Sequence, residues 1–303
     1  MSKTLKSNPS GWIFLFLFPA LTVYAVFTLW PVLASLYYSF FQWNGFGTKP
    51  TYFVGLRNYK DVLKDQFFWN AFKNTFVFVV GNNLIKLPLT LILAFMLNLP
   101  FFRARNIYRV ILFLPVVTST AIIGIIFTFL LSPWNGPVNS ILIESGILKN
   151  PVDWLGSAGR AMAMIMLVEI WHYTGQYIVY WIAGLQSIPD ELYEAAAIDG
   201  TNKLQMFFYI TLPVLKPVII VVSLIGFIMS LRVFDIVIAM TGGGPAYGTD
   251  VIGTYIYRSA FGVASRKIGY ASAIAVIFGF IVMSLGLIQG IAMNKSGKAA
   301  DAE

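Results

Sequence analysis

Six long apolar stretches, separated by short polar loops, constrain this chain more than any other feature. A helix needs about 20 mostly apolar residues to cross the hydrocarbon core of a bilayer, and each stretch is long enough. Hydrophobic residues make up 58% of the 303 residues and charged residues only 11%, too few to cover the surface of a water-soluble protein of this size. We therefore expect an all-α polytopic membrane protein, and these values exclude an ordinary cytosolic enzyme and a disordered chain.

The stretches predict one transmembrane domain of six helices, with both termini on the same side of the membrane. Prolines at positions 19, 31, 88 and 115 are expected to kink their helices, which neighbouring segments in a bundle tolerate. Loops this short leave no room for a second domain. The expected helices cover residues of about 12–40, 68–97, 107–131, 161–185, 213–240 and 268–292.

The distribution of Lys and Arg does not by itself orient the chain. Nine of these residues fall in the loops on each side, and only the cluster Arg103, Arg105 and Arg109 favours a cytoplasmic position for its loop. The net charge of +8 fits loops facing anionic lipid headgroups better than it fits a nucleic-acid partner. With no cysteine, the chain has no disulfide, no thiolate nucleophile and no cysteine-based metal site.

The loop of residues 187–212, between the fourth and fifth stretches, has the pattern of a bent helical projection. Ser187 is expected to cap a short helix with two acidic residues in its first turn, and Gly200 is expected to end that helix in the left-handed conformation. A second short helical segment, residues 204–209, then leads to Pro213. From these residues alone, docking onto another protein and lying on the headgroups as an amphipathic connector are equally open.

The same loop carries a resemblance to a known family. Glu194-Ala195-Ala196, three residues, Gly200, nine residues and Ile210-Thr211-Leu212-Pro213 resemble the EAA motif of binding-protein-dependent ABC importers. A second block, residues 234–261 with Thr241-Gly242-Gly243-Gly244-Pro245, is similar to the MalF- and UgpA-like carbohydrate-uptake permeases. The likeness covers nearly the whole chain, although the extra N-terminal helices and the large external domain of maltose-transporter MalF are lacking. It implies the fold of a type I ABC importer permease.

This resemblance implies a role, a set of partners and a location. The chain would form half of the pathway of an ATP-driven sugar importer, for oligosaccharides in particular, together with a second, MalG-like permease subunit. Two ATPase subunits would bind ATP and Mg, because this chain has no phosphate-binding loop and is expected to bind no cofactor or metal. An extracytoplasmic solute-binding protein would deliver the sugar. The membrane would be the bacterial or archaeal cytoplasmic (inner) membrane.

The resemblance also orients the chain and assigns the coupling residues. It places the EAA loop and both termini in the cytoplasm and the Thr241–Pro245 turn outside, as a bend beneath the binding protein or simply as a flexible loop. The residues that would couple to the ATPase are Glu194, Ala195, Ala196, Asp199, Gly200, Ile210, Leu212 and Pro213.

Polar residues at membrane depth are costly and usually face a cavity or a partner, so they are candidates for the substrate pathway. In the fourth helix they recur at three- and four-residue steps along one face, and hydrogen bonds between helices are the alternative explanation. Two charges three residues apart in the fifth helix are favoured as an internal or inter-subunit salt bridge over a sugar contact. The candidates are Glu169, His172, Tyr173, Gln176 and Tyr180 in the fourth helix, and Arg232 and Asp235 in the fifth.

Two other classes of protein compete with the importer interpretation. An ion-coupled secondary transporter acting alone would use Glu169, Arg232 and Asp235, but such carriers usually contain internal repeats, and the sequence shows no convincing second copy. A membrane-embedded enzyme is disfavoured by the single histidine, the absence of cysteine and the lack of catalytic motifs.

Overall fold

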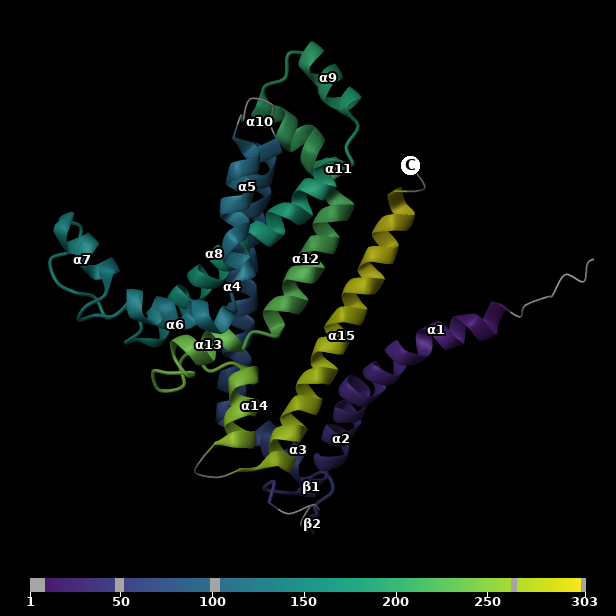
Figure 1. The fold of residues 1–303 in the computed structure, drawn as a ribbon, viewed down its shortest axis with the longest axis vertical. Coiled ribbons are helices and arrows are strands. Elements are labelled where there is room, and N and C mark those ends of the chain that lie inside the picture. The colour runs from purple at the N-terminus through teal and green to yellow at the C-terminus, as the bar shows by residue number, and fades with distance from the viewer. Residues whose placement is uncertain (1–8, 47–51, 99–103, 263–265, 301–303) are drawn as a thin grey trace, which may run out of the picture. The chain divides into compact units, whose positions relative to one another are not determined.

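The computed structural model describes residues 9–46, 52–98, 104–262 and 266–300, and its ribbon is shown in Figure 1. The chain divides into two compact units. Residues 1–65 and 256–279 belong to the smaller unit, and residues 66–255 and 280–303 belong to the larger one. Regular structure in the described residues is helical except for one hairpin of two-residue strands, in agreement with the expected all-α class.

The smaller unit begins with a long helical run and is closed by side-chain hydrogen bonds. Its elements are α1 (Pro9–Tyr24), the π-helical η1 (Ala25–Leu29), α2 (Trp30–Tyr38), β1 (Phe41–Gln42), β2 (Tyr52–Phe53), α3 (Arg57–Lys64), the end of α14 (Ile252–Phe261) and the start of α15 (Ile268–Ala300). The strands pair antiparallel, with Phe41 opposite Phe53. Asn58 donates hydrogen bonds of 2.8 and 3.0 Å to the carbonyl oxygens of Ser39 and Phe41, which ties α3 to the hairpin.

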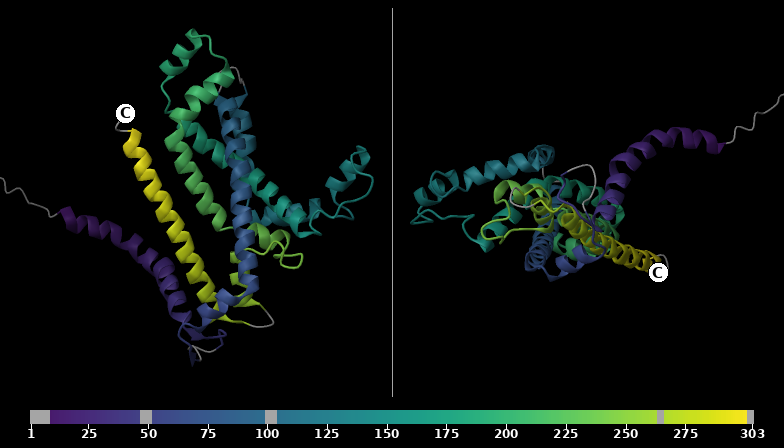
Figure 2. Two further views of the ribbon diagram at one scale, coloured as in Figure 1. Left: turned by 180° about the vertical axis from the view of Figure 1, so that it is seen from behind. Right: turned by 90° about the horizontal axis from the view of Figure 1, so that it is seen from below.

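The larger unit holds the two candidate sites. Its elements are α4 (Gln66–Asn98), α5 (Arg105–Phe113), the 3₁₀ turn η2 (Leu114–Val117), α6 (Thr120–Leu130), α7 (Pro137–Glu144), α8 (Ala158–Leu185), α9 (Asp190–Ile198), α10 (Lys203–Met206), the π-helical η3 (Phe207–Thr211), α11 (Leu212–Val214), α12 (Lys216–Leu231), α13 (Asp235–Met240), the start of α14 and the end of α15. Helix α4 packs along α8 and α12. In Figures 1 and 2, α9 lies at one end of this unit, and α6 and α13 lie side by side farther from that end.

Two apolar clusters stabilise the larger unit. One gathers residues of α4, α6, α8 and α13 around Phe78, Ile165 and Val237. The other joins α4, α8 and the start of α12 around Trp181 and Leu215. The indole nitrogen of Trp181 donates a 2.9 Å hydrogen bond to the hydroxyl of Thr90, so the one polar atom of this buried ring is satisfied.

Three of the described helices are long and apolar enough to cross a membrane by themselves: Ile13–Tyr38, Gln66–Asn98 and Ile268–Leu287. The number rises to five if each of two bent helix pairs counts as one span. Helix α8, predicted as residues 161–185, has 28 residues, but it carries the polar stripe and buries residues along its whole length. A helix enclosed by protein does not need a uniformly apolar surface.

The structure corrects two of the predicted helices. The segment 107–131 is not one helix: α5 and α6 meet at 96°, and Pro115 lies in the 3₁₀ turn between them, so the expected kink is a full corner. The segment 213–240 is interrupted as well, because α12 ends at Leu231 and α13 begins only at Asp235. No proline or glycine lies at this second break.

Candidate functional site

The loop of residues 187–212 forms the projection that the sequence predicts, with a different start. Helix α9 begins at Asp190, and its N-cap is Pro189, whose side chain makes no capping hydrogen bond. The expectation that Ser187 caps this helix is wrong, because its hydroxyl donates instead to the carbonyl oxygen of Gly184, at the end of α8. Asp190 and Glu191 lie in the first turn of α9, where negative charge is favourable.

Gly200 ends α9 in the left-handed conformation, with φ of 76°. Its N–H donates to the carbonyl oxygen of Ala197, and the N–H of Thr201 donates to that of Ala196, both at 3.1 Å. This pair of bonds is a Schellman motif, which satisfies carbonyl groups left open at the end of the helix. Asp199 occupies the C-cap position, so its carboxylate lies at the turn that reverses the chain.

The return segment attaches the projection to the body of the unit. Asn202 and Gln205 form a reciprocal capping box at the start of α10. The hydroxyls of Tyr193 in α9 and Thr211 in η3 lie 3.0 Å apart in a hydrogen bond. Leu212 packs against the second apolar cluster, and Pro213 stands in the first turn of α11, where a missing N–H is tolerated.

The coupling residues expected from the EAA motif divide into an outer and an inner group. Ala196 is buried, and Ile210 and Leu212 are half-buried, so these residues hold the projection in place. The other five are exposed at its surface: Glu194, Ala195, Asp199, Gly200 and Pro213. Large apolar side chains are exposed beside them, among them Ile198 at 86% and Tyr209 at 79%. An exposed apolar patch with a polar rim is typical of a surface that contacts another molecule.

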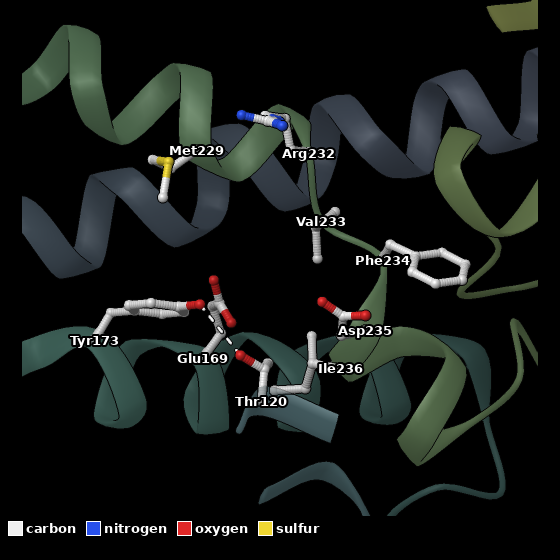
Figure 3. Close-up of a pocket in the computed structure, with 9 residues that line it drawn as sticks. All are labelled: Thr120, Glu169, Tyr173, Met229, Arg232, Val233, Phe234, Asp235 and Ile236. Carbon is white, nitrogen blue, oxygen red and sulfur yellow. Dashed lines mark hydrogen bonds between the residues drawn. The ribbon is translucent and has the colours of Figure 1, made fainter. Parts of the chain in front are cut away.

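The second candidate site is a cavity of about 130 Å³ at the break between α12 and α13. Figure 3 shows Glu169 and Tyr173 rising from α8, Met229 and Arg232 on the opposite wall, and Asp235 at the start of α13. The hydroxyl groups of Tyr173 and Thr120 form a 3.2 Å hydrogen bond, marked in the figure. The cavity therefore gathers two carboxylates, one guanidinium and two hydroxyls, groups that bind polar ligands.

The polar stripe of α8 does not line one continuous surface. Only Glu169 and Tyr173 reach the cavity. His172 is buried and its Nε2 lies 3.1 Å from the carbonyl oxygen of Thr118, beyond the corner at η2. Gln176 donates a 2.6 Å hydrogen bond to the hydroxyl of Tyr180. Because a helix rises 1.5 Å per residue, Tyr180 stands roughly 16 Å along the axis from Glu169, beyond the depth of a cavity this small.

Within this chain, Arg232 and Asp235 do not form the internal salt bridge, and a salt bridge to a partner subunit stays a prediction. The two residues lie on either side of the break rather than on one face of a helix, and no ion pair within 4 Å joins these described residues. The carboxylate of Glu169 is instead attracted by the positive charge of Lys86 in α4. Their charged atoms are more than 4 Å apart, so the two residues do not form a direct ion pair. Lys86 is 1% exposed, and its ammonium lies 4.4 Å from the centre of the Tyr177 ring.

Several lining residues of the cavity escape sequence reasoning. Thr120, Met229, Val233, Phe234 and Ile236 are ordinary residues within apolar stretches. Asp235 is the one usable signal, because acidic residues are favoured in the first turn of a helix. An acidic residue inside an apolar stretch can therefore indicate that a new helix begins there.

The glycine-rich loop after α13 is held by hydrogen bonds. The hydroxyls of Thr241 and Thr249 lie 2.7 Å apart, and Thr249 also donates to the carbonyl oxygen of Gly244 at 2.6 Å. From α4, Asn70 donates a 2.7 Å hydrogen bond to the carbonyl oxygen of Tyr247. The loop therefore has a defined shape that is fixed to α4.

Comparison with known proteins identifies the family. Residues 86–295 match the family described as "Binding-protein-dependent transport system inner membrane component". The chain is 36% identical to the probable ABC transporter permease protein YurN of Bacillus subtilis, over 94% of this chain and 96% of the relative. It is 35% identical to the lactose transport system permease protein LacF of Rhizobium radiobacter, over 92% of each chain.

A solved structure supports the same grouping. The fold is similar to a chain of a bacterial ABC transporter involved in the import of the acidic polysaccharide alginate, with a TM-score of 0.83 and 26% identity. The match covers 97% of this chain and 99% of that chain. The same similarity holds for that transporter in complex with an alginate pentasaccharide-bound periplasmic protein, with a TM-score of 0.81 and 26% identity over 95% of this chain and 96% of that chain.

Proposed function

Because this chain belongs to the family of binding-protein-dependent transport system inner membrane components, we propose that it forms half of the pathway of a sugar importer and is driven through the projection at α9. It is a transporter subunit and not itself an enzyme. A second permease subunit completes the pathway, two ATPase subunits bind ATP and Mg, and an external binding protein delivers the sugar. Relatives whose names specify lactose or arabinooligosaccharides support a saccharide as cargo.

The observation that carries this proposal is the surface of the projection. Residues 187–212 contain the acidic residues Asp190, Glu191, Glu194 and Asp199 but only one basic residue, Lys203. Helices that lie on membranes are rich in Lys and Arg, and an acidic surface is repelled by anionic headgroups. Exposed apolar side chains combined with carboxylates fit a protein partner with an apolar groove and a basic rim. Docking onto an ATPase is therefore favoured over the headgroup connector.

The contacts of the projection allow movement of α9 to be passed on to α12. Ala196 is buried, and the hydroxyl of Tyr193 bonds to Thr211, so α9 cannot move far without moving η3. Leu215 follows η3 as a fully buried anchor in the second apolar cluster, and α12 then runs to the break beside the cavity. Rigid-body movement of packed helices is a standard way for a local event to change a distant site.

This role orients the chain. A projection that meets an ATPase lies in the cytoplasm, so both termini lie there as well, and the Thr241–Pro245 turn lies outside. The hydrogen-bonded loop of residues 241–250 then offers the binding protein a surface of fixed shape. Sugar released there enters the cavity, where Glu169, Arg232 and Asp235 hydrogen-bond its hydroxyls and the Tyr173 ring covers an apolar face.

The decisive experiment is purification of this chain after co-expression with candidate ATPase and second permease subunits. We expect Glu194→Lys to lose the ATPases while the second permease is retained, because the substitution places a positive charge opposite a basic rim. Glu144→Lys, which changes an exposed carboxylate on α7, is the matched control and is expected to retain both. Retention of the ATPases by Glu194→Lys and by Gly200→Pro would overturn the coupling role.

Reconstituted transport separates the importer from an ion-coupled carrier. In proteoliposomes, saccharide uptake is expected only with ATP, the ATPases and the binding protein together. Uptake driven by a proton or sodium gradient in vesicles that hold this chain alone would establish the secondary transporter instead.

A further inference from the structure

A cluster of buried polar residues lies next to the cavity without lining it. Asn82, Asn83 and Lys86 of α4 are 0%, 3% and 1% exposed, and their spacing of three and four residues places them on one side of the helix. The Lys86 ammonium lies over the Tyr177 ring, and the amide nitrogen of Asn83 donates a 2.9 Å hydrogen bond to the hydroxyl of Ser230. We call these five residues the inner polar cluster.

Much of the hydrogen-bonding capacity of this cluster is unused. Asn82 makes no hydrogen bond through either side-chain atom, and the side-chain oxygen of Asn83 also has no partner among the described residues. Burying an amide without partners costs free energy, and most buried polar groups in proteins are paired. These two buried amides therefore have three side-chain atoms that could form hydrogen bonds with a polar ligand.

The cluster is separated from the cavity by the last turn of α12. Met229 lines the cavity, whereas its neighbour Ser230 bonds to Asn83 on α4. Glu169 lines the cavity and faces Lys86 electrostatically. Helix α12 ends one residue after Ser230, directly before the chain break. No helix continues beyond this turn to hold it in place.

We propose that the inner polar cluster is a second sugar-binding site, opened from the cavity when the last turn of α12 moves away from α4. The inference rests on the proposed function as a sugar importer. A sugar hydroxyl donates and accepts hydrogen bonds, and an asparagine amide offers both a donor and an acceptor. Lys86 adds donors and disfavours a metal cation, and the nearby carboxylate of Glu169 disfavours an anion, so the chemistry fits an uncharged polyol. The opening exposes Asn82 first to water and then to sugar.

The absence of cysteine from this chain allows a direct test. Asn82→Cys is introduced into the complete transporter, and its reaction with a small membrane-permeant thiol reagent is followed by mass spectrometry, at rest and during ATP turnover. The probe is whichever saccharide the wild-type complex takes up from a panel that begins with lactose and arabino-oligosaccharides. Ala94→Cys is the control, because Ala94 is fully buried on the same helix within the second apolar cluster.

We expect Asn82→Cys to be unreactive at rest, to react about tenfold faster during turnover, and to be protected by the saccharide. Reaction without protection would show a space filled with water only and would overturn the proposal. No reaction in any state, or equal reaction of Ala94→Cys, would overturn it as well. If the wild-type complex takes up no saccharide, the proposed function fails, which is a distinguishable result.

A second variant tests binding by a different measurement. Asn82→Leu keeps the approximate volume and removes no hydrogen bond within the protein, so a merely structural residue would tolerate it. Loss of one bond to an uncharged ligand is expected to weaken saccharide binding to the solubilised complex about fivefold. Thr90→Val, about two turns along α4 from Asn82, is expected to lower thermal stability and leave saccharide affinity intact, because Thr90 bonds to Trp181. Unchanged affinity in Asn82→Leu would contradict the proposal.

Discussion

The amide nitrogen of Asn83 donates a 2.9 Å hydrogen bond to the hydroxyl of Ser230. This bond joins the middle of α4 to the last turn of α12, directly before the chain break that forms the cavity. A single hydrogen bond at this point stabilises the observed position of the end of α12 on α4. It is not strong enough to exclude a second position.

Removal of this bond should weaken the packing of α12 on α4. We expect Ser230→Ala to lower the free energy of unfolding by about 1 kcal/mol, as for a typical buried hydrogen bond. A double-mutant cycle with Asn83→Ala should give a coupling energy of about 0.5 kcal/mol or more. Ser284→Ala is the control, because its exposed hydroxyl bonds only to its own helix. Additive effects of the two substitutions would contradict a direct interaction.

Gly226 is required where α12 approaches α4. A Cβ at this position would lie 2.5 Å from the side-chain oxygen of Asn83. We therefore expect Gly226→Ala to destabilise the protein by about 1–3 kcal/mol, although alanine is the better helix former. Gly279→Ala, where a Cβ meets no atom within 4 Å, should be neutral or stabilising. Thermal unfolding of both purified variants compares them, and equal effects would argue against the close contact.

Gly200 is needed for its backbone conformation alone, because a Cβ there meets no atom within 4 Å. A side chain in the left-handed region costs about 1–2 kcal/mol, so Gly200→Val should loosen the end of α9 and reduce retention of the ATPases. Asparagine tolerates this conformation, and Gly200→Asn should retain most of the coupling. Co-purification measures both variants, with Gly159→Ala as the control in a helical position that is also open. Equal losses for Val and Asn would contradict the backbone explanation.

Substitutions of Tyr173 and Gln176 are expected to have different effects on saccharide uptake, although the sequence places both residues in one polar stripe. Tyr173 lines the cavity, so Tyr173→Ala is expected to reduce saccharide uptake about tenfold without loss of assembly, through the lost ring and hydroxyl. Gln176 bonds to Tyr180 outside the cavity, so Gln176→Ala should transport normally. Uptake in proteoliposomes measures both variants. Wild-type uptake by Tyr173→Ala would remove this residue from the pathway.

Local sequence signals predicted the projection well. The acidic first turn of α9 and its glycine end both follow from chemistry within a few residues, and the Schellman bonds at Gly200 need no distant partner. The start was misplaced because the Ser187 hydroxyl had a closer carbonyl acceptor, at Gly184 in the preceding helix. A serine hydroxyl can bond to any of several nearby backbone groups, and here it bonds to the end of the preceding helix rather than to the start of the next one.

The helix break at residues 232–234 had no such signal. Periodicity treats Arg232 and Asp235 as neighbours on one helical face, and neither proline nor glycine marks the interruption. Packing of α13 against α6 and α8 places the chain there, and those contacts join segments far apart in the sequence. A local pattern therefore finds the charges but misassigns their relationship.

The amino-acid sequence by itself determined that this chain is a helical membrane protein with an EAA-type projection, because apolar length, turn chemistry and motif spacing are all properties of contiguous residues. Only the tertiary structure decided which polar side chains share a space. Glu169, Arg232 and Asp235 meet at one cavity, while Asn82 and Asn83 are buried with unused hydrogen-bonding groups. That selection depends on how helices bend and pack, and buried polar groups acquire their partners only when separate helices come together.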